Sequence, residues 1–188
     1  MTRMEAQVHI ENYLKSHNIR YAKNVDNGIP HITILYVNCD RCPDNILESC
    51  IWFYKDVMEA RVYYDQTAAN WCRISSHTPE LMRLLNYINA RVWPRTTDRM
   101  GNGLYMPSCL CTSRIYLTED DGYDITLTSM IPYDFFELAP LESEDFITAY
   151  CPSLLDELSP AIFGVLFGRL DTEQTIEYIK KNILHEVD

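Results

Sequence analysis

Two cysteine pairs are the residues of this 188-residue chain whose types and spacing come closest to a chemical site. Cys39 and Cys42 form a Cys-x-x-Cys pattern in a loop rich in turn-forming residues, and Cys109 and Cys111 form a second, closer pair. Four thiolates can hold a zinc ion tetrahedrally. The pattern therefore allows a thiol or zinc-binding protein, although the second pair has one intervening residue instead of two.

The cysteines also fit simpler interpretations. In an extended strand Cys109 and Cys111 would face the same side as Ile115, where free cysteines act as small core residues. A redox pair normally heads a helix that lowers the thiol pKa, and Pro43 could begin such a helix, but no βαβ pattern surrounds it. We expect reduced thiols, and we predict no metal ligands and no cofactor.

No catalytic motif accompanies these cysteines. The sequence has neither H-E-x-x-H nor G-x-S-x-G, and the neighbours Ser75, Ser76 and His77 are not a triad, because triads are spatial. We predict a protein that is not an enzyme and has no catalytic residue, with an enzyme of unrecognised site as an open alternative. The five histidines are scattered, at positions His9, His17, His31, His77 and His185.

Clustered carboxylates have structural explanations. The run Glu119-Asp120-Asp121, with Asp124, does not match a calcium-binding loop and predicts a solvated turn. A second group, Glu142, Glu144 and Asp145, stands at an expected helix start, where negative charge offsets the helix dipole.

Aromatic side chains suggest an interaction surface. Trp52, Phe53 and Tyr54 are consecutive, so they cannot all face one side of a sheet. Tyr63 should point outward together with Glu59 and Arg61, because strand residues alternate. Aromatic and arginine side chains anchor many interfaces. The sequence leaves open whether these and further aromatics form such a surface or a second core under the C-terminal helices; the further ones are Trp71, Trp93 and Tyr105.

The charge is −11 and unevenly distributed. Residues 1–100 hold 12 basic and 11 acidic side chains, whereas residues 101–188 hold 4 and 16. This balance argues against nucleic acid as a partner, and the acidic half is either a solubilising surface or a face for a basic partner. The longest apolar stretch, 161–167, is too short to span a membrane, and no signal peptide is apparent. We expect a cytoplasmic protein.

Periodicity predicts the elements. Helices are expected over residues 4–17 and 78–92, the second capped by Thr78, and strands over 21–25, 29–37, 50–57 and 60–66. After a basic loop, 95–103, a hairpin should join 104–118 to 123–131. From Ser143 the pattern is helical, with an interruption at Pro152, a short apolar helix from Pro160 and a last helix after a capping box at Asp171.

The element order is typical of an α+β fold, with helices packed on one face of an antiparallel sheet. In outline it is helix, three or four strands, helix, two strands and helix, followed by C-terminal helices. We predict one domain over 1–188, in which 143–188 could form an appended helical subdomain.

This order resembles the type III secretion chaperone-like fold, shared by the YbjN-like family. The residues that carry the resemblance are the helix at 84–89 and the hairpin from 114–118 to 123–128, and the likeness would cover residues 4–160. It implies a small, acidic, dimeric protein that holds a peptide or partner in a groove, and it transfers no catalytic residue. We therefore predict a protein-interaction module that binds a partner segment on a sheet face or groove and forms a homodimer.

Overall fold

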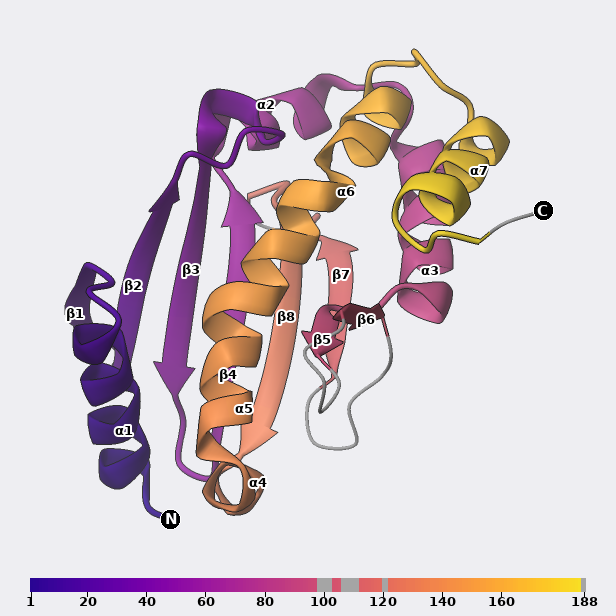
Figure 1. Ribbon diagram of the computed structural model, residues 1–188. Coiled ribbons are helices and arrows are strands. Elements are labelled where there is room, and N and C mark those ends of the chain that lie inside the picture. The colour runs from indigo at the N-terminus through magenta and orange to yellow at the C-terminus, as the bar shows by residue number, and fades with distance from the viewer. Residues whose placement is uncertain (98–102, 106–111, 120–121, 187–188) are drawn as a thin grey trace.

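A six-stranded antiparallel sheet forms the centre of the computed structural model, which describes residues 1–97, 103–105, 112–119 and 122–186. The strand order is β1-β2-β3-β4-β8-β7, and helices cover one face (Figure 1). The predicted α+β class is thereby confirmed. The strands of this sheet are β1 (Tyr21–Asp26), β2 (Ile29–Val37), β3 (Ile46–Phe53), β4 (Val57–Tyr64), β7 (Ser113–Leu117) and β8 (Ile125–Pro132).

The first four strands follow one another as antiparallel neighbours. Asn27 and Gly28 both have positive φ, 49° and 77°, as the Asn-Gly signal for a tight hairpin predicts. A short 3₁₀ turn (Pro43–Asn45) leads into β3, which begins four residues before the expected start. Helix α2 (Gln66–Ile74) was not predicted from the sequence. Its N-cap is Asp65, whose side chain accepts a hydrogen bond from the backbone N–H of Ala68.

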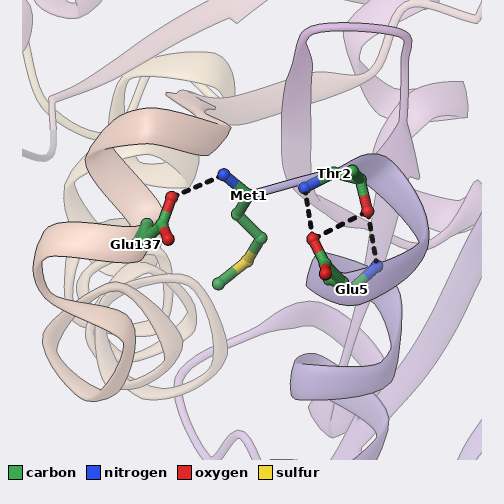
Figure 2. Close-up of polar contacts among 4 residues, drawn as sticks. All are labelled: Met1, Thr2, Glu5 and Glu137. Carbon is green, nitrogen blue, oxygen red and sulfur yellow. Dashed lines mark hydrogen bonds and ion pairs between the residues drawn. The ribbon is translucent and has the colours of Figure 1, made fainter.

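The remaining helices are α1 (Arg3–Ser16), α3 (Thr78–Arg91), α4 (Tyr133–Leu138), α5 (Pro140–Asp145), α6 (Cys151–Leu166) and α7 (Thr172–Asn182). In α1 the Thr2 hydroxyl and the Glu5 carboxylate satisfy each other's backbone N–H groups, while the Met1 amine contacts Glu137 of α4 (Figure 2). In α3 the N-cap is His77 rather than the expected Thr78. None of the helices in the described residues is long and apolar enough to cross a membrane.

The prolines do not divide the C-terminal helical region as expected. A π-helical turn (Phe146–Tyr150) joins α5 to α6, so the chain stays helical from Pro140 to Leu166. Pro152 lies where the π-helical turn runs into α6 and does not interrupt the helical backbone. Pro160 lies inside α6 and does not start a helix. The predicted capping box of the last helix is confirmed at Asp171 and Gln174.

The expected strand over 104–118 is divided. β5 (Arg95–Thr97) and β6 (Gly103–Tyr105) form a separate two-stranded sheet, and β7 starts only at Ser113. Cys109 and Cys111 lie outside the described residues. The Asn89 side chain of α3 both donates to and accepts from the backbone of Ile115, at 2.8 Å each, so α3 closes the β7 edge of the sheet.

The core lies between the sheet and the helices. Alternate strand residues such as Ile51, Val62 and Leu127 are buried, and they pack with the apolar residues of α6, including Phe163. The apolar segment 161–166 of α6 is buried within its own chain. The intervening strand residues, among them Leu35, point to the opposite side, which the described helices leave open.

Candidate binding face on the open side of the sheet

The side chains of this open face stand in three rows that cross the sheet. The strand register aligns them as His31, Trp52, Glu59 and Met130 in one row, Thr33, Cys50, Arg61, Thr128 and Arg114 in the next, and Leu35, Glu48, Tyr63, Thr126 and Tyr116 in the third. Charged, aromatic and apolar groups therefore alternate over five adjacent strands. The outward direction predicted for Glu59, Arg61 and Tyr63 is confirmed.

A nearly buried carboxylate organises the first two rows. Glu59 is only 9% exposed, and its Oε2 accepts hydrogen bonds from Arg61 at 2.9 Å and from Tyr54 at 3.2 Å. Its Oε1 accepts from the Thr128 hydroxyl at 3.2 Å. The bond to Glu59 raises the pKa of Arg61. Glu59 and Arg61 thus form a hydrogen-bonded, charged centre on this face.

Aromatic rings flank this centre. His31 stacks on Trp52 with ring centroids 4.2 Å apart, and Trp52 in turn stacks on Tyr54 at 6.5 Å. On the other side, the Tyr63 hydroxyl donates to Glu48, and burial together with this bond raises the Tyr63 pKa. These contacts hold the rings in place, so the face is ordered before any partner arrives.

A hollow of about 660 Å³ opens between this face and the tip of the β7–β8 hairpin. Its walls include Trp52, Arg61, Tyr63 and Tyr116, and Asp124 stands at its hairpin end. Burial raises the pKa of the Asp124 carboxyl, an effect that Glu48 increases and Arg73 opposes. A Cβ on Gly122 would lie 2.2 Å from Asp124 Oδ2, so a larger residue at position 122 would make this carboxylate shift.

The other predicted aromatic residues lie elsewhere. Phe53 is fully buried in the core. Trp71 meets Phe163 and Phe167 edge-on at 5.7 and 5.0 Å on the helical side, and Trp93 is half-buried. The Tyr105 side chain falls outside the described part of the chain. The aromatics therefore divide between the open face and the helix-covered core, and neither sequence interpretation holds for all of them.

The histidines and the serine pair do not converge on a site within the described residues. His9 packs edge-on against Phe136, His17 contacts the Tyr13 carbonyl, and His185 is exposed. The Ser75 hydroxyl donates to the Leu166 carbonyl and accepts from the backbone N–H of His77, so it caps backbone groups instead of facing an imidazole.

The remaining candidate residues, the Cys39/Cys42 pair and the carboxylates of α5, lie at two separate places in the fold. Cys39 and Cys42 lie close to Asp156 of α6, a residue that the sequence analysis did not select. Glu144 is buried in α5, and the neighbouring Asp145 accepts a hydrogen bond from Tyr13 at 2.6 Å.

Comparison of the chain with protein-family models, with curated proteins and with solved structures finds no match. The resemblance to the YbjN-like family stays a prediction.

Proposed function

We propose that this protein is a non-catalytic interaction module whose open face binds an extended, basic segment of a partner protein. The observation that carries the proposal is the hollow of about 660 Å³ on the open face of the sheet, which Met82 of α3 borders at one side. Sheet faces in water are usually polar, whereas this one displays Trp52, Tyr63 and Tyr116 around a charged centre. Such rings with arginine are the residues that dominate binding energy at interfaces.

The charge of the hollow favours a cationic partner. Arg61 is already paired with Glu59, so the other charged side chains of the lining are the acidic Glu119 and Asp124. Arg73 offsets part of the charge of Asp124, and Glu48 adds a further carboxylate beside the hollow. A lysine or arginine near Asp124 would stabilise its ionised form, which burial now disfavours. The overall charge of −11 would steer a basic segment toward this acidic molecule.

Unused hydrogen-bonding atoms on the same face also support the proposal. Arg61 Nε and His31 Nδ1 are buried and have no hydrogen-bond partner among the described residues. Buried polar atoms in native proteins are normally satisfied. The backbone or side chains of a bound segment could supply the missing partners.

The test selects random twelve-residue peptides on the purified protein and measures their affinity by fluorescence polarisation. We expect the selected peptides to be enriched in lysine or arginine and in apolar residues. Trp52→Ala should weaken their binding about 30-fold, as expected for loss of a central aromatic anchor. Asp124→Asn should weaken it about tenfold, and raising the salt concentration should reduce the wild-type affinity.

Glu173→Gln is the matched control, because Glu173 is an exposed carboxylate on α7, a helix of the covered side. It should leave peptide affinity unchanged. Enrichment of acidic peptides, or equal affinity of the wild type and both open-face variants, would contradict the proposal.

Self-association is a second proposal, supported by a different surface. The corner where α1, α4 and α5 meet carries large apolar side chains that are strongly exposed. A surface of this kind usually marks an interface, and we propose that two copies of the chain meet there. The side chains and their exposed fractions are Met4 74%, Val8 54%, Phe135 44%, Leu138 73% and Leu141 61%.

A further inference from the structure

Three side chains that can bind a metal converge where the loop between β2 and β3 meets α6. One donor atom from each of Cys39, Cys42 and Asp156 lies within 4.8 Å of the other two. Cys42 Sγ donates to Asp156 Oδ1 at 3.1 Å, and the backbone N–H of Arg41 donates to the same oxygen at 3.1 Å. The thiols and the carboxylate therefore already face a common point.

The spacing of the three donor atoms, all within 4.8 Å of one another, is close to what a tetrahedral zinc ion requires. With Zn–S near 2.3 Å and Zn–O near 2.0 Å, two sulfurs lie roughly 3.8 Å apart and a sulfur and an oxygen roughly 3.5 Å apart. The observed 3.1 Å between Cys42 Sγ and Asp156 Oδ1 needs to open by only a few tenths of an ångström. Shifts of this size are within the range of side-chain rotation.

Hydrogen bonds hold the residues around the cluster in place. The Cys-x-x-Cys turn is closed by a hydrogen bond from Cys42 N to Cys39 O at 3.0 Å. Behind Cys42, the Ser159 hydroxyl lies 3.3 Å from the sulfur and 2.9 Å from the Tyr64 hydroxyl, and Tyr64 in turn donates to a carbonyl of α6. Hydrogen bonds of this outer kind orient metal ligands and tune their affinity.

We propose that Cys39, Cys42 and Asp156 bind a zinc ion, with water as the fourth ligand. Two soft sulfur donors and one carboxylate suit zinc better than magnesium or calcium. Water can reach the site because Cys39 and Asp156 are only half-buried, and Cys42 borders a second hollow of about 500 Å³. On binding, both thiol protons pass to solvent, and two thiolates, one carboxylate and Zn²⁺ together carry one negative charge.

Cobalt is the probe for the first test, because thiolate ligands give Co²⁺ an intense near-ultraviolet absorption. The full chain, reduced and freed of metal with a chelator, is titrated with Co²⁺ and then with Zn²⁺. We expect the band to saturate at one equivalent and to disappear when zinc displaces cobalt. Cys39→Ser and Asp156→Asn should each weaken binding by more than the roughly 10- to 100-fold that outer-shell changes cost.

Cys72→Ala is the matched control, because Cys72 is a buried thiol of α2 outside the cluster. It should keep the band and the stoichiometry. Zinc should also raise the unfolding temperature of the wild type and of Cys72→Ala but not that of Cys39→Ser, with circular dichroism showing that every variant is folded. Absence of the band in the wild type, or its persistence in Cys39→Ser, would overturn this assignment of the ligands.

Discussion

Glu144 is a single residue whose protonation should affect folding. It is 7% exposed in α5, and burial, with a smaller contribution from Asp145, raises the pKa of its carboxyl from 4.5 to about 7, against the opposing effect of His17. The folded protein therefore holds this proton more tightly than the unfolded chain. The cost of ionising Glu144 in the folded state is absent below pH 4.5 and reaches its full size once the pH exceeds about 7.

We therefore predict that Glu144→Gln stabilises the protein at pH 8 and has little effect near pH 4.5. The gain at pH 8 is at most about 3 kcal/mol, since each pKa unit corresponds to about 1.4 kcal/mol. Urea unfolding of the wild type and the variant at both pH values measures it. Glu142→Gln, an exposed position of the same helix, is the control. An equal effect of Glu144→Gln at both pH values would mean that burial does not raise the pKa of this carboxyl.

At the residue scale, the sequence predicts which side of a strand a side chain faces better than it predicts contacts between residues that are far apart in the chain. The alternation of β4 was enough to place Tyr63 and Arg61 outward, because strand residues alternate with a period of two. It could not predict that Asp156 would join Cys42, because 114 positions separate them and only the packing of α6 brings them together. The Asn89 bonds to the β7 edge were missed for the same reason.

At the scale of elements, α6 shows how packing overrides a local signal. Pro160 predicts a helix boundary, since proline removes a backbone N–H and crowds the preceding turn. The helix nevertheless continues, because twelve of its sixteen residues are buried and ending it would expose them. Local signals succeeded where packing does not oppose them, as at Asp171, the exposed N-cap of α7. The capping box of Thr2 and Glu5 was present in the sequence and could have extended the first predicted helix to Arg3.

We predict that Pro160→Ala stabilises the protein by about 1 to 3 kcal/mol, the range expected when a helix-interior proline is removed. The alanine N–H can bond to the carbonyl of Asp156, and the exposed position should tolerate the change. Thermal unfolding measures the gain. Pro79→Ala is the control, because Pro79 is also exposed but lies in the first turn of α3, where a missing N–H costs little. Equal effects of the two substitutions would contradict the explanation.

At the scale of the whole molecule, the fold separates two surfaces with different properties. The open face is charged, aromatic and held by internal hydrogen bonds, whereas the corner of α1, α4 and α5 is apolar and exposed. The α+β class and the one-sided packing of helices followed from the element order. The apolar corner could not be predicted from the element order, because α4 was not predicted. The exposure of its apolar side chains also depends on how α1, α4 and α5 pack against one another.

We predict a homodimer through this corner. Light scattering after size-exclusion chromatography should give a mass near twice 22.0 kDa, unchanged between low and high salt because the contact is apolar. The double variant Leu138→Ser with Leu141→Ser should elute as a monomer. Leu35→Ser removes an exposed apolar side chain (54% exposed) from the open face and should remain a dimer. A monomeric wild type, or a dimer lost in Leu35→Ser but kept in the double variant, would place self-association elsewhere and leave the corner without a partner.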